Sequence, residues 1–192
     1  MDANCVGGVI LAGGAGDRLG GIDKPMLRVG GQLLLTRAVR AFGQARVVLT
    51  GTPRPGFERY RWVREDPPGS GPTAALVAGL VELDPAVDPI GLLAADLVGV
   101  TDDTIRRLCG AVDRVDNADG AVLTDSTGHP QWVISVWRAA ALRAALPQVP
   151  AGVPLRAALG SLRATEVPEL PGESADIDTP EDLEWARTTG QR

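Results

Sequence analysis

The glycine-rich stretch VILAGGAGDRLGGIDKP, at residues 9–25, contains the side chains that first point to chemistry. An apolar run ends just before Gly13, and the loop that follows carries Arg18 and Lys24 among its glycines. Backbone N–H groups around Gly13 and Gly14 would face a phosphate chain, which Arg18 and Lys24 would neutralise. The pattern favours a cradle for a triphosphate over the alternative, a long surface turn whose cations are only solvated.

Two other kinds of glycine loop do not match this stretch. A Walker A loop requires Ser or Thr directly after its lysine, whereas Lys24 is followed by Pro25. A dinucleotide-binding fingerprint requires a third small residue where this loop has Leu19, and an acid where the second strand ends in Thr-Gly. The sequence therefore argues against both of these phosphate-binding loops.

Carboxylates that follow apolar runs are the second group of candidates. Asp96 follows the run IGLLAA, and a charge at the end of a buried strand is costly unless it is paired or binds a cation. We expect Asp96 to bind Mg²⁺ and to link it to nucleotide phosphates; the alternative is a turn-forming residue before the next helix. Asp178 in IDTPEDL is a candidate second metal ligand, or it simply precedes the Thr179 helix cap.

Composition narrows the class of protein. The chain has 192 residues with one histidine and two cysteines, which build neither a multi-histidine metal site nor a disulfide framework. A formal net charge of −5 argues against nucleic acid as a partner. The apolar runs are shorter than a membrane span and the first residues do not resemble a signal peptide. We therefore expect a cytoplasmic protein with no membrane partner.

Short apolar runs alternate with amphipathic segments along the chain, as in parallel strands connected by helices. The sequence therefore predicts an α/β fold: a three-layer α/β/α sandwich around a mostly parallel, Rossmann-like sheet, in one domain over residues 1–192. Ligands bind beyond the carboxyl ends of such strands, where the glycine loop and Asp96 would both lie. A hairpin of residues 120–123 and 131–137 is expected as an antiparallel addition at the sheet edge. The other expected strands are 6–11, 46–50, 61–64, 90–95 and 164–167, and the expected helices are 32–42, 73–83, 138–146, 154–162 and those capped by Thr101 and Thr179.

The loop LAGGAGDRLGGIDKP resembles the signature loop of the molybdenum cofactor guanylyltransferases, within the larger NTP-transferase superfamily. REDPPGSGPTAAL, LLAADLVGVT, GHPQW and DIDTPEDL fall where that family has its other motifs, so the resemblance covers nearly the whole chain. It implies a sheet of the nucleotide-diphospho-sugar transferase type and Mg²⁺-dependent transfer of GMP from GTP to molybdopterin cofactor, with release of pyrophosphate. Because cytidylyl-transferring relatives usually have Leu-Ala-Ala-Gly, Gly13 favours GTP.

The resemblance also implies roles for individual residues. Arg18, Lys24 and Asp96 would be catalytic, and Asp96 and Asp178 would be metal ligands. The nucleotide-binding residues would be Leu11, Ala12, Gly13, Gly14, Arg18, Lys24, Asp66, Gly71 and Asp96. For Asp66 an ordinary rigid loop is an equally good interpretation, as is a plain helix entry for Gly71.

Three departures from the family pattern keep other hypotheses open. Asp17 stands where many relatives have a second Arg, no Pro follows Asp96, and Gly51 stands where the second strand is expected to be followed by Asn. One rival is transfer of another nucleotide, or transfer to another phosphorylated acceptor. Another is a non-catalytic nucleotide- or cofactor-binding protein on the same fold, and an NAD-dependent oxidoreductase is a distant third.

Partners are only weakly indicated by the sequence. The resemblance implies GTP and a molybdopterin-type acceptor as small-molecule partners, with transient contact to molybdoenzymes or cofactor-synthesis proteins. Four arginines in RPGFERYRWVRE could contact an anionic acceptor, but a solvated strand edge is the favoured interpretation. These four are Arg54, Arg59, Arg61 and Arg64.

Overall fold

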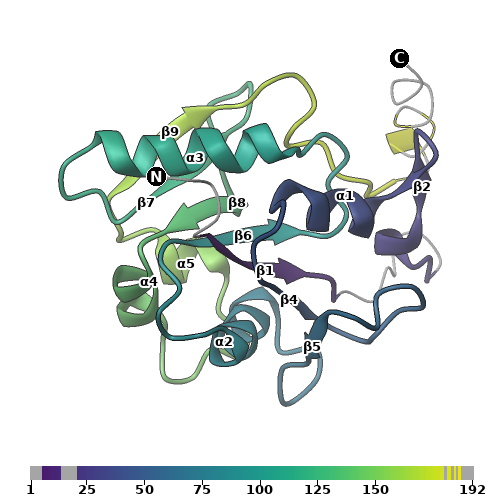
Figure 1. Ribbon diagram of the computed structural model, residues 1–192, viewed down its shortest axis with the longest axis horizontal. Helices are drawn as coiled ribbons and strands as arrows, with labels where there is room; N and C mark the ends of the chain where they lie inside the picture. The colour runs from purple at the N-terminus through teal and green to yellow at the C-terminus, as the bar shows by residue number, and fades with distance from the viewer. Residues whose placement is uncertain (1–5, 14–20, 180, 183, 185, 187–192) are drawn as a thin grey trace.

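The computed structural model describes residues 6–13, 21–179, 181, 182, 184 and 186, and Figure 1 shows a central sheet with helices on both faces. The seven strands of this sheet have the order β5-β4-β1-β6-β8-β7-β9. They are β1 (Gly7–Leu11), β4 (Val47–Thr50), β5 (Arg61–Val63), β6 (Ile90–Ala94), β7 (Gly120–Thr124), β8 (Pro130–Trp137) and β9 (Ala164–Pro168). The helices are α1 (Leu34–Ala41), α2 (Pro72–Glu82), α3 (Asp102–Arg114), α4 (Ala139–Ala145) and α5 (Leu155–Leu159), with a short 3₁₀ helix, η3 (Lys24–Met26).

Each face of the sheet packs against its own layer of helices. Helices α1 and α3 cover one face, and α2, α4 and α5 cover the other (Figure 1). Ile10 and Leu93 pack in the first cluster and their chain neighbours Val9 and Leu92 in the second, because successive strand residues point to opposite faces. The predicted three-layer α/β/α sandwich is thus confirmed.

The hairpin of β7 and β8 is not an addition at the sheet edge, so that expectation was wrong. Strand β8 is antiparallel to both β6 and β7 and lies between them, and β9 pairs with the far side of β7 in parallel. The turn signal in the sequence predicts that these two strands pair, but not which of them inserts next to β6. The buried end of β8, with Ile134, Val136 and Trp137, fits an interior strand.

The predicted helix over residues 32–42 begins two residues later. Gln32–Leu33 (β3) instead pairs with Arg28–Val29 (β2) in a small antiparallel hairpin. Gly30 and Gly31, with φ values of 59° and 77°, form its two-residue turn, which requires positive φ at both positions. None of the described helices has the length and apolar character that a bilayer crossing requires.

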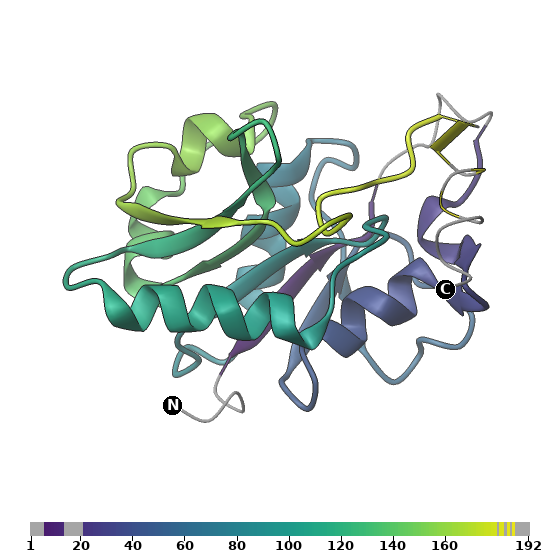
Figure 2. The ribbon, with the colours of Figure 1, turned by 90° about the horizontal axis from the view of Figure 1, so that it is seen from above.

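The segment near the C-terminus lies far from the strands that precede it in the chain. Figures 1 and 2 both show this yellow segment next to β2, and Ile177 packs in a small cluster with Val29 and Leu34. Thr179 Oγ1 accepts a hydrogen bond from the Asp182 N–H at 3.1 Å, and Asp182 Oδ2 accepts one from the Thr179 N–H at 2.7 Å. The predicted Thr179 cap is therefore confirmed by a reciprocal capping pair.

Candidate functional site

The carboxyl ends of four parallel strands meet at one edge of the sheet. Leu11 at the end of β1 lies opposite Thr50 of β4 on one side and Ala94 of β6 on the other, and Thr50 lies opposite Val63 of β5. The segments that leave these strands share this edge, where open α/β sheets bind their ligands. They include Gly13, Gly51, Arg64, Asp66 and Asp96.

The first residues after β1 are still held by the sheet. The Ala12 N–H donates to the Thr50 carbonyl at 3.0 Å, and the Leu11 carbonyl accepts from the Ala95 N–H at 2.9 Å. The Ala12 N–H is therefore already used and is not available as a donor to a phosphate, and the Leu11 carbonyl is an acceptor that cannot bind one. Gly13 is the first exposed residue, and no described atom lies within 4 Å of the position that a Cβ would take there.

The close crossing of this loop over β4 explains the glycine at position 51. Gly51 has a φ of +122°, and a Cβ there would lie 3.0 Å from both the Ala12 carbonyl oxygen and the Gly13 nitrogen. Only glycine fits this backbone and this contact without strain. The departure from the family pattern at this position thus serves the packing of the loop.

Lys24 projects from η3 towards the C-terminal segment. Pro25 beside it is buried, which fixes the backbone of this short helix. The Lys24 ammonium donates a hydrogen bond to Asp178 Oδ1, and only 15% of the lysine side chain remains exposed. The structure therefore joins two of the predicted site residues, which are 154 positions apart in the sequence.

Asp96 lies in the turn after β6 and is electrostatically coupled to this ion pair. Burial raises the pKa of its carboxyl, the negative charge of Asp178 raises it further, and its own backbone N–H and the Lys24 charge oppose the shift. The net effect is a pKa above the ordinary value, so the negative charge of Asp96 is not fully compensated by the protein. Lys24, Asp96 and Asp178 thus form one cluster.

A third carboxylate at this edge, Asp176, was missed from the sequence. The Ala175 carbonyl accepts a hydrogen bond from the Val98 N–H at 2.8 Å, which holds this segment beside the turn that contains Asp96. Ile177 is fully buried, whereas Asp176 is exposed and Asp178 is half-buried. Although Asp176 has an exposed side chain, loss of hydration and the charges of Asp178 and Asp96 raise its pKa. The alternation Asp-Ile-Asp was the available signal.

The carboxylates of this cluster could supply one or two ligands to Mg²⁺ but not a complete protein shell. Among the described residues, no group of three or more His, Cys, Asp or Glu side chains is placed to hold a metal ion. Protein sites for Mg²⁺, however, use one or two carboxylates and complete the shell with water and substrate phosphates. Asp96, whose charge is under-compensated, fits that role, whereas Asp178 is bonded to Lys24. The assignment of Asp178 as a metal ligand stays a prediction.

Within the described part of the chain, no side-chain hydrogen bond or ion pair joins the remaining predicted residues to this cluster. Asp66 is exposed on the loop after β5, without a side-chain hydrogen bond among the described residues. Gly71 has a φ of 93° at the start of α2, where its carbonyl accepts from the Ala75 N–H at 3.1 Å. Gly14 and Arg18 lie outside the described residues.

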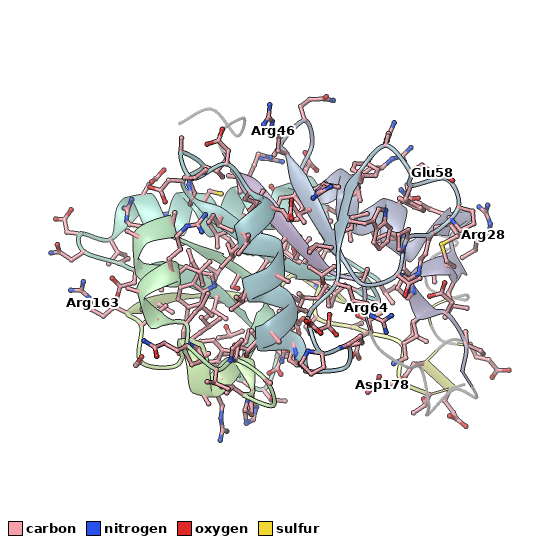
Figure 3. All side chains as sticks on the ribbon, turned by 90° about the horizontal axis from the view of Figure 1, so that it is seen from below. Arg28, Arg46, Glu58, Arg64, Arg163 and Asp178 are labelled. Carbon is pink, nitrogen blue, oxygen red and sulfur yellow. The ribbon has the colours of Figure 1, made fainter. Side chains whose placement is uncertain are left out.

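The four arginines near β5 have different environments. Arg59 and Arg61 interact locally with Tyr60 and Glu82 and fit the predicted solvated edge. Arg64 is exposed and forms no ion pair in the described part of the chain; Figure 3 shows it towards the same end of the molecule as Asp178, opposite to Arg163. Arg54 differs because only 10% of its side chain is exposed.

Residues 8–166 match the family model of the MobA-like NTP transferase domain. The chain belongs to this family. A molybdenum cofactor guanylyltransferase of Bradyrhizobium sp. (strain ORS 278) is 36% identical over 141 residues, which cover 69% of this chain and 66% of that protein. One of Vibrio atlanticus (strain LGP32) is 31% identical over 109 residues, which cover 54% of this chain and 55% of that protein. The resemblance in the sequence motifs is thus confirmed, although the matched part is less than two thirds of either relative.

A solved structure supports the fold. The crystal structure of molybdopterin-guanine dinucleotide biosynthesis protein A from Archaeoglobus fulgidus has a TM-score of 0.70 and covers 95% of this chain and 97% of that chain. The sequence identity is 17%, so the similarity concerns the fold alone. The mostly parallel sheet of the nucleotide-diphospho-sugar transferase type is confirmed.

Proposed function

We propose that this protein is a Mg²⁺-dependent nucleotidyltransferase that moves GMP from GTP to a molybdopterin cofactor and releases pyrophosphate. The observation that carries the proposal is the convergence of Lys24, Asp96 and Asp178 at the carboxyl edge of the sheet, beside the loop that leaves β1. The guanylyl group and the acceptor are inferred from the names of the relatives, and the reaction chemistry is inferred from the residues of this chain.

The reaction requires no protein nucleophile. The terminal phosphate oxygen of the acceptor attacks the α-phosphorus of GTP, a new P–O bond forms, and the bond to the β-phosphate oxygen breaks as pyrophosphate leaves. Lys24 would offset charge on the phosphate oxygens once nucleotide competes with Asp178 for its ammonium group. Because the sheet edge holds both reactants in line, positioning supplies much of the rate.

Asp96 would hold Mg²⁺ together with phosphate oxygens of the nucleotide, and the bound ion would supply charge stabilisation at the reacting phosphorus. The under-compensated charge of this carboxylate supports the assignment. Arg18 and Gly14, which lie outside the described residues, are proposed to contact the triphosphate as in the family motif.

The space around Gly13 supports close approach of a nucleotide at this position. This residue has no described neighbour within 4 Å of its Cβ position and no positive φ, so protein packing does not require glycine there. Close approach of a ligand is a reason for glycine at an otherwise open position. We therefore expect Gly13→Ala to fold normally and to reduce the use of GTP.

The test is pyrophosphate release by the purified protein with Mg²⁺ and either GTP or CTP, with and without molybdopterin cofactor. Release with GTP and acceptor together is the expected result, and Gly13→Ala should lose it while its thermal unfolding is unchanged. Release with CTP would replace the nucleotide in the proposal. Nucleotide binding without any release would favour the rival hypothesis of a non-catalytic binding protein.

We place this reaction in the cytoplasm and expect transient contacts with cofactor-synthesis proteins or molybdoenzymes, since the dinucleotide product must be handed on. Crosslinking in cells, followed by recovery of this protein, tests the expectation. Recovery of the protein only from another compartment, or with partners unrelated to molybdenum, would contradict it.

A further inference from the structure

Arg54 is held by several groups at once. Its Nε lies 2.8 and 2.9 Å from the two carboxylate oxygens of Asp23, and its Nη1 donates to the Thr52 carbonyl at 3.1 Å. The guanidinium carbon lies 5.7 Å from the centre of the Trp62 ring. With 10% of its side chain exposed, Arg54 is far more enclosed than Asp23, which is 48% exposed. A planar guanidinium suits this combination of a forked contact and an aromatic face.

Asp23 connects this arginine to the catalytic candidate Lys24. The Asp23 carbonyl accepts a hydrogen bond from the Met26 N–H at 2.9 Å, which closes the first turn of η3, while its carboxylate binds Arg54. Both polar groups of Asp23 are therefore used, one in η3 and one in the contact with the segment after β4. Lys24 follows directly, so the direction in which its side chain leaves the backbone depends on how Asp23 is held.

We propose that Arg54 is a positioning residue that anchors Asp23 and thereby directs Lys24 to the phosphates of the bound nucleotide. The inference rests on the proposed function of this edge. Arg54 comes from a segment 31 residues away, which leaves β4 next to the end of β1. Displacement of a charged group by about 1 Å can cost a hundredfold in rate, so an anchor outside the reacting atoms has a measurable effect.

A second ion pair in the same region provides a matched control. Arg61 Nε lies 2.8 Å from Glu82 Oε2, the same kind of contact at nearly the same distance. Arg61 is, however, 65% exposed and lies at the amino end of β5, away from η3. Arg61→Ala therefore removes an arginine ion pair without touching the anchor of Lys24.

The first experiment does not depend on activity. Hydrogen exchange is measured by mass spectrometry on peptides that cover residues 21–33 in the wild type, Arg54→Ala, Asp23→Asn and Arg61→Ala. Faster exchange of the Met26 and Leu27 amides is expected in the first two variants and not in the third, because those amides bond to the Asp23 and Lys24 carbonyls. Unchanged exchange in Arg54→Ala would overturn the anchoring role.

The second experiment is a set of kinetic double-mutant comparisons. Arg54→Ala and Asp23→Asn are each expected to lower kcat by roughly 10- to 100-fold with a smaller change in KM, and the double variant should be no worse than either. In a Lys24→Ala background, Arg54→Ala should cost nothing further. Arg54→Lys should recover only a small part, because lysine lacks the fork that holds Asp23.

Additive losses, or full activity in Asp23→Asn with loss in Arg54→Ala, would overturn the proposal and make Arg54 a direct ligand of the substrate. If the wild type binds GTP but releases no pyrophosphate, the proposed function fails and the same comparisons are made on GTP affinity. A loss of affinity in Arg54→Ala that disappears in the Lys24→Ala background would then still support positioning. Equal losses in both backgrounds would overturn it.

Discussion

Two acids on the segment after β9, Glu173 and Asp176, have opposite environments. Glu173 is 4% exposed, yet its carboxylate is bonded by Arg107 and Thr104 of α3, and its Oε2 also accepts from the Leu170 N–H at 2.6 Å. A buried carboxylate with hydrogen-bond partners on both oxygens holds its surroundings in place. Glu173 thus ties the start of this segment to α3.

Around Asp176, only three residues after Glu173, negative charges outweigh the positive charge. Burial and then the charges of Asp178 and Asp96 raise the pKa of Asp176, and among the described residues the Lys24 charge opposes the shifts of Asp96 and Asp176. Excess negative charge in a protein is costly, and it is typical of sites that a ligand or a metal ion completes. Glu173 therefore stabilises the fold, whereas the uncompensated acids at the sheet edge are proposed to interact with a ligand.

The largest expected effect concerns the structural acid. Glu173→Ala should lower the free energy of unfolding by about 3–5 kcal/mol, because it leaves the Arg107 charge without its main buried partner. Urea denaturation followed by circular dichroism measures the change. A loss below about 1 kcal/mol, the value typical of an exposed ion pair, would show that Glu173 contributes no more than a surface ion pair and would contradict its structural role.

Removal of a charged side chain at the sheet edge should lower the turnover rate and not the free energy of unfolding. Asp96→Ala and Lys24→Ala should each raise the reaction barrier by about 3–4 kcal/mol, hundreds-fold in rate, while both proteins remain folded. Steady-state pyrophosphate release gives the rate, and circular dichroism checks the fold. Turnover close to wild type in either variant would remove that residue from its proposed role.

Much of the fold was predictable because it depends on local patterns. Apolar runs of strand length, helix caps such as Thr179 and the apolar helix α2 fix the layers without reference to distant contacts. The position of β8 was not predictable, because a hairpin signal says which strands pair but not which one enters the sheet. The β2–β3 hairpin was not predicted, because Leu33 of β3 continues the helical spacing of the apolar residues in α1.

The site could be predicted only in part for a similar reason. Lys24, Asp96 and Asp178 stand out as charges at the ends of apolar or glycine-rich stretches, and the structure brings them together. Asp176 and the contact of Arg54 with Asp23 were not predicted. Both depend on segments that are distant in sequence: Val98 holds the chain beside Asp96, and the strand order brings the end of β4 next to the end of β1.

The dependence of stability on pH tests whether the acids at the sheet edge differ from Glu173. The pKa of Asp96 is raised above its ordinary value of 3.8, so its ionised form destabilises the fold increasingly as the pH rises from 3.8 through the folded-state pKa. Asp96→Asn removes this penalty and should therefore raise the Tm at pH 7. The gain should disappear below pH 3.8, where the wild-type carboxyl is protonated in both states. Calorimetry across this range tests it, and a lower Tm at pH 7 would show that Asp96 stabilises the fold.

The smallest expected effect is at Asp176. Its pKa is also raised, so Asp176→Asn should stabilise the protein at pH 7, but solvent screens an exposed side chain and the gain should stay below about 0.5 kcal/mol. Asp102, an exposed acid in the first turn of α3, is the matched control, because its charge interacts favourably with the helix N-terminus and with Arg106. Asp102→Asn should therefore lower the Tm where Asp176→Asn raises it. Calorimetry of both variants at low ionic strength measures the direction in which each Tm changes. If both variants are destabilised, Asp176 stabilises the fold as Glu173 does, and the excess negative charge at the sheet edge is confined to Asp96.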